Sequence, residues 1–136
     1  MKTYKIDIDN EIDFLILGVN SHIKLYKLCW EINKQLNTNF IKNHNHKKPS
    51  QPTQSFERFT FRDNKSETQY NILSNRCESG YLDKKNKSVN YFILVQGGVY
   101  SKNKIIDNLN KISDILLVFE INLPQIDSIN SFIIHD

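Results

Sequence analysis

The stretch DFLILGVNSHIKLYKLCWEINKQL, residues 13–36, passes from the residue pattern of a buried strand to that of a helix. Its first part is a dense apolar run, and the polar break Asn20-Ser21-His22 follows. Beyond the break, apolar residues recur three and four positions apart, which places them on one face of an α-helix. Ser21 is a candidate N-cap, because a serine hydroxyl can accept a backbone N–H at a helix start. We therefore expect a buried strand that leads into the main core helix, whose apolar face consists of Leu25, Leu28, Cys29, Ile32 and Leu36.

Three further segments have the patterns of strands. Residues 56–63 and 68–76 alternate apolar and polar side chains, and the polar residues 64–67 between them suit a turn. These two segments are predicted to form a β-hairpin. Residues 88–96 are apolar on both faces, which is typical of a strand in the centre of a sheet.

The last third of the chain predicts one more helix and one more strand. Residues 102–112 have apolar side chains at helical spacing, with Ser101 as the candidate cap, and residues 115–123 have the pattern of a strand. The tail to residue 136 is rich in isoleucine and is expected to pack back on the fold. The predicted architecture is α+β: a single-domain, two-layer sandwich with a mostly antiparallel sheet, the element order β-α-β-β-β-α-β, and two helices on one face.

Two segments lack a clear core pattern. Residues 4–9 alternate apolar and polar side chains and suit a short edge strand or an extended arm. Residues 37–55 hold two of the three prolines among many polar residues, and we expect a mobile loop there. His44 and His46 lie in this segment without an acidic or cysteine neighbour, whereas a zinc site needs three or four ligands. No metal and no cofactor are therefore expected.

Composition and charge are typical of one soluble domain. The 136 residues are 39% hydrophobic and carry a net charge of +3. The two cysteines do not form a CxxC pair, which fits a reducing compartment. The N-terminus lacks the apolar core of a signal peptide, and no apolar run approaches the ~20 residues that a membrane helix needs. We expect a cytoplasmic protein with no membrane partner.

The basic residues of the predicted hairpin suggest a partner-binding surface. All three arginines of the chain lie in residues 56–76. Strand alternation turns Phe59 and Phe61 to the core face and Arg58 and Arg62 to the outer face, where a guanidinium group can recognise an anionic group or partner. The following loop adds a basic cluster. The candidate partner-binding residues are Arg58, Arg62, Lys84, Lys85 and Lys87.

Two segments, Asp13–Lys34 and Asn75–Leu94, resemble the IPExxxVDY family of small Bacteroidetes proteins, which has no established activity. The second segment contains NRCESGYL and then the region of the naming motif. There Val89 and Tyr91 match the motif, while Asn90 replaces its aspartate. The Ile-Pro-Glu positions hold Asp83, Lys84 and Lys85. The resemblance implies no catalytic residue, and these replacements favour a structural loop-to-strand turn.

Three functions are compatible with these features. The first is a non-catalytic module that binds another cytosolic protein through the basic residues. The second is an RNA- or ribosome-associated protein that uses the same residues and binds with steep salt dependence. The third is a small enzyme in which His22 acts with Asp13 or Cys77. The partner and the oligomeric state stay open at this point.

Overall fold

The structure, a computed structural model, describes residues 14–135. Its centre is a six-stranded antiparallel sheet with the strand order β10-β1-β9-β6-β5-β2. The strand β9 lies between β1 and β6, as its apolar character on both faces predicted. The segment 4–9 lies outside the described residues. The strands of this sheet are β1 (Phe14–Asn20), β2 (Ile41–Lys42), β5 (Arg58–Asp63), β6 (Thr68–Ser74), β9 (Tyr91–Gln96) and β10 (Leu117–Glu120).

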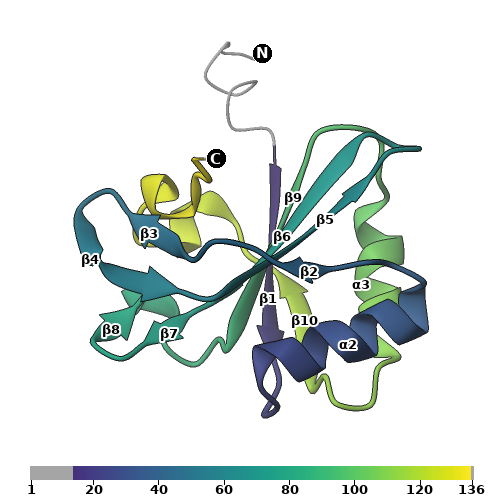
Figure 1. Cartoon of the computed structure of the whole chain (residues 1–136), viewed down its shortest axis with the longest axis horizontal. Helices are drawn as coiled ribbons and strands as arrows, with labels where there is room; N and C mark the ends of the chain where they lie inside the picture. Colours follow the sequence, from purple (N-terminus) through teal and green to yellow (C-terminus); the bar gives the residue numbers. More distant parts are fainter. Residues whose placement is uncertain (1–13, 136) are drawn as a thin grey trace.

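Two helices, α2 (Leu25–Leu36) and α3 (Lys102–Asn110), pack on one face of this sheet (Figure 1), which confirms the predicted architecture. The apolar face of α2 is buried as expected, and Leu28 and Ile32 are almost completely inaccessible to solvent. Side chains at alternate positions of β1, from Leu15 to Val19, complete this core. Within residues 14–135, no helix is long and apolar enough to cross a membrane.

The two predicted helix caps have different outcomes. The hydroxyl of Ser101 accepts the N–H of Lys104 at 3.3 Å and caps α3, as predicted. The predicted cap at Ser21 is wrong, because α2 begins after Lys24 without a side-chain cap. The hydroxyl of Ser21 instead donates to the carbonyl of Asp114 at 2.7 Å, and joins two segments that are distant in sequence. A tertiary contact has replaced the local one.

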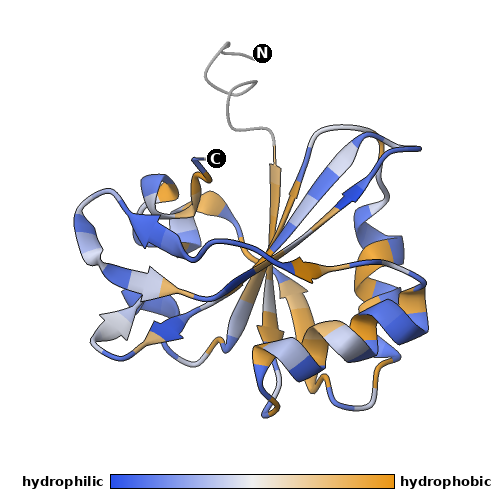
Figure 2. Ribbon diagram, viewed as in Figure 1, coloured by the Kyte–Doolittle hydropathy of each residue, from blue (hydrophilic) through white to orange (hydrophobic). Residues whose placement is uncertain are grey.

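The opposite face of the sheet is covered by two small hairpins and the C-terminal segment (Figure 1). The tail packs back as expected, and the ring of Phe132 lies edge-on to that of Phe92 with 5.0 Å between centroids. Figure 2 shows hydrophobic residues along the central strands and more hydrophilic residues on the hairpins. The covering elements are β3 (His46–Lys48), β4 (Gln51–Phe56), β7 (Arg76–Cys77), β8 (Gly80–Tyr81) and the 3₁₀ helices η1 (Lys84–Asn86), η2 (Leu123–Gln125) and η3 (Ile129–Phe132).

The polar segment 37–55 has more regular structure than the sequence predicted. It contains β2, β3 and most of β4, and the hairpin β3–β4 turns at Pro49-Ser50. The side chain of Lys48 is only 6% exposed, and its Nζ donates to the carbonyl of Tyr81 at 2.9 Å. Polar residues in this segment therefore bind other parts of the fold, a role that composition alone does not reveal.

A cluster of buried polar groups holds the connection from β6 to β9. Asn75 and Asp83 are completely buried. The Nδ2 of Asn75 donates to the carbonyls of Asn86 and Val89, at 2.8 Å each, and its Oδ1 accepts the N–H of Asp83 at 2.9 Å. The Asp83 carboxylate accepts the backbone N–H groups of Lys85 and Asp127, at 3.1 Å each. Residues 83–91 thus form a structural loop that leads into β9, in agreement with the interpretation of the sequence.

Candidate functional site

An open pocket of about 540 Å³ lies between the C-terminal half of α2, the helix α3 and the strands β5 and β6. Its floor is apolar and its rim is polar, which is the usual composition of a binding pocket. The floor consists of Ile32, Leu36, Phe40, Phe61, Tyr70, Ile93, Ile105 and Leu109. The rim consists of Asn37, Thr38, Arg62, Asp63, Asn64, Lys65 and Asn108. We call this feature the interhelical pocket.

Three aromatic rings form one wall of the interhelical pocket. Phe61 and Tyr70 are paired across β5 and β6, and their rings stack with 5.8 Å between centroids. Phe40 lies 5.5 Å from Phe61 and 6.2 Å from Tyr70. The side chain of Asn33 on α2 holds Phe40 in place, because it accepts the N–H of Phe40 at 2.7 Å and donates to its carbonyl at 3.0 Å. The wall is therefore built before any ligand arrives.

The polar groups beside this wall include the phenol of Tyr70, which is uncharged near neutral pH. Burial raises the pKa of Tyr70, and the nearby Asp63 and Tyr100 raise it further. The hydroxyl of Tyr70 therefore stays protonated near neutral pH. The carboxylate of Asp63 accepts the backbone N–H of Lys65 at 3.0 Å and so holds the β5–β6 turn. Arg62 and Lys65 are exposed at the rim.

One edge of β5 is open next to the pocket. The strand β2 pairs with β5 only at Ile41–Thr60 and Lys42–Phe59, so residues 61–63 have only β6 as a strand neighbour within the described chain. The carbonyl of Arg58 accepts the N–H of Asn43 from the β2 side. Backbone groups alternate along a strand, so the N–H and C=O of Arg62 point to the same side of β5 as the carbonyl of Arg58. At Arg62 this side lies beyond the end of β2.

The candidate residue Arg58 is not on the surface, and its predicted exposure is wrong. It faces away from the helices, as strand alternation predicted, but its side chain is only 3% exposed. Its Nε donates to the Oδ1 of Asn71 at 2.9 Å. The hairpin β3–β4 and the C-terminal tail cover this part of the sheet, whereas Arg62 lies further along the strand and is exposed.

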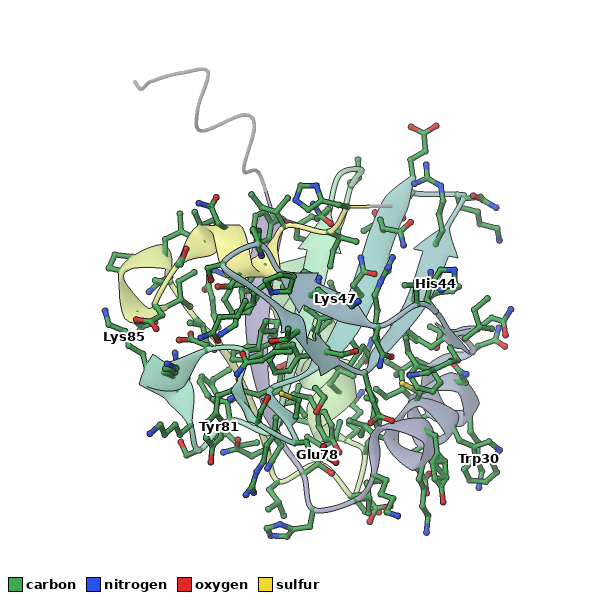
Figure 3. All side chains as sticks on the ribbon, turned by 60° about the vertical axis from the view of Figure 1, so that its left-hand side comes forward. Trp30, His44, Lys47, Glu78, Tyr81 and Lys85 are labelled. Carbon is green, nitrogen blue, oxygen red and sulfur yellow. The ribbon has the colours of Figure 1, made fainter. Side chains whose placement is uncertain are left out.

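The candidate lysines lie in a different region from Arg62. Lys84 and Lys85 are exposed on η1, and Lys87 follows. Lys85 donates to the carbonyl of Pro124 at 3.4 Å, and the Nζ of Lys87 lies 5.6 Å from the ring centre of Tyr81. Figure 3 shows Lys85 and Tyr81 on the side of the molecule away from Trp30 and α2. The structure therefore does not join the predicted arginines and lysines into one surface.

The residues of the enzyme hypothesis are also separated. His22 is exposed in the turn between β1 and α2, whereas Cys77 lies in β7 and packs against the core on the other face of the sheet. Asp13 lies outside the described residues. Within the described chain, no group of three or more His, Cys, Asp or Glu residues is arranged to hold a metal ion.

We expect Cys77 to react with Ellman's reagent in the folded protein at pH 8, and Cys29 to react only after unfolding. Burial raises the pKa of Cys29 to about 12, and its side chain is 1% exposed, so the thiolate is scarce and inaccessible. Burial also acts to raise the pKa of Cys77, but hydrogen bonds from Ser79, Gly80 and Ser55 outweigh it, and the pKa is lowered. Counting thiols before and after adding guanidinium chloride tests this. Two rapidly reacting thiols in the folded protein would contradict it, and Cys77→Ser is the control.

The sequence alone did not identify the interhelical pocket. The alternation of apolar and polar residues correctly placed Phe59 and Phe61 on the core face, and this alternation was the sequence feature that pointed toward the pocket. Phe40 lies in the segment expected to be a loop, and its contribution depends on Asn33. No family model matches the chain, and no curated protein matches it either.

Proposed function

We propose that this chain is a non-catalytic, cytosolic module that binds an extended segment of another protein. The segment adds to the open edge of β5 and places an apolar side chain in the interhelical pocket. The observation that carries this proposal is the position of an open apolar pocket directly beside an unpaired length of strand. Addition of a strand to a sheet edge is a common mode of peptide recognition, in which backbone hydrogen bonds give affinity and side-chain pockets give specificity.

The energy of such a complex would come mainly from the pocket. Burial of one large apolar side chain contributes roughly 1.5–3 kcal/mol, and contact with the aromatic rings of Phe61 and Tyr70 adds to it. The backbone groups of Arg62 supply hydrogen bonds at the edge. Because the wall of the pocket is held by Asn33 and Phe40, little conformational entropy is lost there on binding.

The charges at the rim indicate the character of the partner segment. Arg62 and Lys65 are exposed, and the carboxylate of Asp63 is engaged in the β5–β6 turn. A segment with an acidic residue next to its apolar anchor therefore complements the rim. Of the residues predicted from the sequence, Arg62 keeps a role in this proposal, and Lys87 serves as a remote control.

Selection of peptides from a random display library on the intact chain tests the proposal. We expect enrichment of sequences with an aromatic or branched aliphatic residue beside Asp or Glu. Asn108→Trp, which fills the pocket from α3, should abolish binding, and Arg62→Glu should weaken it at least about tenfold, the equivalent of 1.4 kcal/mol. Lys87→Glu makes the same charge change far from the pocket and should leave binding unchanged.

The melting temperatures of these variants separate loss of binding from loss of fold. We expect those of Arg62→Glu and Lys87→Glu to stay close to that of the wild type, because both residues are exposed. Enriched peptides that bind Asn108→Trp as well as the wild type would refute the pocket. Capture of RNA instead, abolished by nuclease and by moderate salt, would favour the RNA-associated alternative.

A further inference from the structure

Given the proposed function, on which this inference rests, we propose that the partner segment is the C-terminus of another protein. Its last side chain occupies the interhelical pocket, and its chain ends against the start of β2. The direction and register that β2 imposes on any strand added to β5 lead to this class of partner. The fitting sequence ends in a large apolar residue that follows an acidic one.

The strand β2 sets the point where an added strand has to stop. It runs antiparallel to β5, and Ile41 is paired with Thr60. A segment that pairs antiparallel with residues 61–63 lies in line with β2 and runs in the same direction, so its carboxyl end points at Ile41. Antiparallel pairing is slightly more stable per residue than parallel pairing. Because the place opposite Thr60 is already taken, the added strand ends opposite Phe61 or has to leave the sheet.

The chain just before β2 is held against α2, so it is a fixed obstacle. The Oδ1 of Asn33 accepts the N–H of Phe40 at 2.7 Å and the hydroxyl of Thr38 at 2.8 Å. The Nδ2 of Asn33 donates to the carbonyl of Phe40 at 3.0 Å, and the ring of Phe40 is buried in the core. Displacing this segment to let a longer chain pass would break these hydrogen bonds, whereas a chain that ends there leaves them in place.

The register places the last residue of the partner in the pocket. Residues directly opposite each other in an antiparallel pair have their side chains on the same face of the sheet. Phe61 faces the helices and lines the interhelical pocket, so the residue opposite Phe61 also points into it. The residue before the last one lies opposite Arg62, and its side chain shares the other face of the sheet with the exposed guanidinium group. An acidic side chain at this position therefore meets Arg62.

The charges at the rim favour a carboxylate over an amino group at the chain end. Asp63 is the one carboxylate among the described residues that line the pocket, and its Oδ1 already accepts the N–H of Lys65. Arg62 and Lys65 are both exposed, so the charged groups of the rim leave a net positive charge. This charge attracts a terminal carboxylate and repels a terminal ammonium group.

Two display libraries of short random peptides test the inference on the intact chain. In the first library each peptide is fused through its N-terminus and ends in a free carboxylate, and in the second each is fused through its C-terminus. We expect enrichment in the first library alone, with an aromatic or branched aliphatic last residue after Asp or Glu. Enrichment in the second library, or in the first without a preference at the last position, would overturn the inference and leave the proposed function standing. Enrichment in neither library would refute the proposed function itself.

Synthetic copies of the most enriched free-ended peptide measure the effect of the chain end. Extension by Gly-Gly beyond the last residue should weaken binding at least about tenfold, because the added residues meet Phe40 and Ile41. Amidation of the terminal carboxylate should weaken it about threefold or more, because the charge is lost. Equal affinity of either modified peptide and the free-ended one would overturn the inference.

Arg62→Gln tests the register separately from the chain end. In this variant the preference for Glu over Gln before the last residue should disappear, while the effect of Gly-Gly extension should remain. Lys87→Gln makes the same charge change far from the pocket and should alter neither. Both residues are exposed, so the melting temperatures should stay close to that of the wild type. A preference for Glu that survives in Arg62→Gln would overturn the register.

Discussion

Asn75→Ala is expected to lower the free energy of unfolding by about 2–6 kcal/mol, because it leaves two buried polar groups without a hydrogen-bond partner. These groups are the carbonyl of Val89 and the N–H of Asp83, whereas the carbonyl of Asn86 still accepts the N–H of Val89 at 3.0 Å. Each unsatisfied buried group costs about 1–3 kcal/mol, so the two together account for the expected loss. Urea denaturation followed by circular dichroism measures it, with the midpoint and slope compared with those of the wild type.

The effect comes from the side chain of Asn75 and not from its backbone. The backbone N–H of Asn75 donates to Asn90, and its carbonyl accepts from Leu82, and both bonds are kept in the alanine variant. Asn75→Asp keeps the acceptor for Asp83 but replaces the amide donor with a second acceptor, and it also adds a charge near the Asp83 carboxylate. We therefore expect it to be no better tolerated than alanine.

Asn103→Ala is the matched control, because Asn103 is exposed on α3 and alanine favours helix formation. It should leave stability within about 0.5 kcal/mol of the wild type. A loss below about 1 kcal/mol for Asn75→Ala would contradict the assignment of this cluster as the support of residues 83–91. So small a loss would require a water molecule to occupy the space of the Asn75 side chain and to form its hydrogen bonds.

Gly98→Ala is expected to destabilise the protein by about 2–5 kcal/mol, and by more than Gly97→Ala. Both glycines have positive φ angles, +70° at Gly97 and +62° at Gly98. An L-residue pays about 1–2 kcal/mol in this region, so both substitutions carry that cost. At Gly98 a Cβ would also clash with the carbonyl oxygen of Ser66 and would lie 2.5 Å from the Oγ1 of Thr68. Overpacking of this kind adds roughly 1–3 kcal/mol.

Gly97→Ala is the internal control for this prediction. Its Cβ would meet only the carbonyl of Glu67, at 3.5 Å, which is an ordinary contact. The clash at Gly98 cannot be relieved by a rotamer change, because the Ser66 carbonyl is backbone and accepts the N–H of Val99 at 3.1 Å. Urea denaturation of the two variants side by side measures the difference. Equal destabilisation would mean that the turns at 64–67 and 97–99 separate at little cost.

The two substitutions also differ in their consequence for binding. The β5–β6 turn carries Lys65 and Asn64, which lie on the rim of the interhelical pocket. Gly98→Ala displaces the backbone of this turn and should therefore weaken peptide binding, whereas Gly97→Ala should not. A comparison of peptide binding by the two variants therefore tests whether the close contact between the turns 64–67 and 97–99 supports the proposed function.

Several elements followed from local patterns, and the structure confirms them. The helical spacing of Leu25, Leu28 and Ile32 identified the buried face of α2. The alternation in residues 56–76 correctly placed Phe59 and Phe61 on the core face, where they pair with Ile72 and Tyr70. The two-faced apolar character of 88–96 identified the central strand β9. These features could be predicted because a helix or strand that buries one face must repeat its apolar residues with its own period.

Other features depended on segments that meet only in the folded chain. Strand alternation placed Arg58 opposite the helices, but it could not show that β3 and the C-terminal tail cover that part of the sheet. Ser21 has the local character of a helix cap, yet it bonds to Asp114, 93 positions away. The interhelical pocket arises in the same way, because Phe40 joins Phe61 and Tyr70 from a separate part of the chain. Periodicity records which face of an element is apolar, whereas what covers the polar face is decided by packing between distant segments, which leaves no period in the sequence.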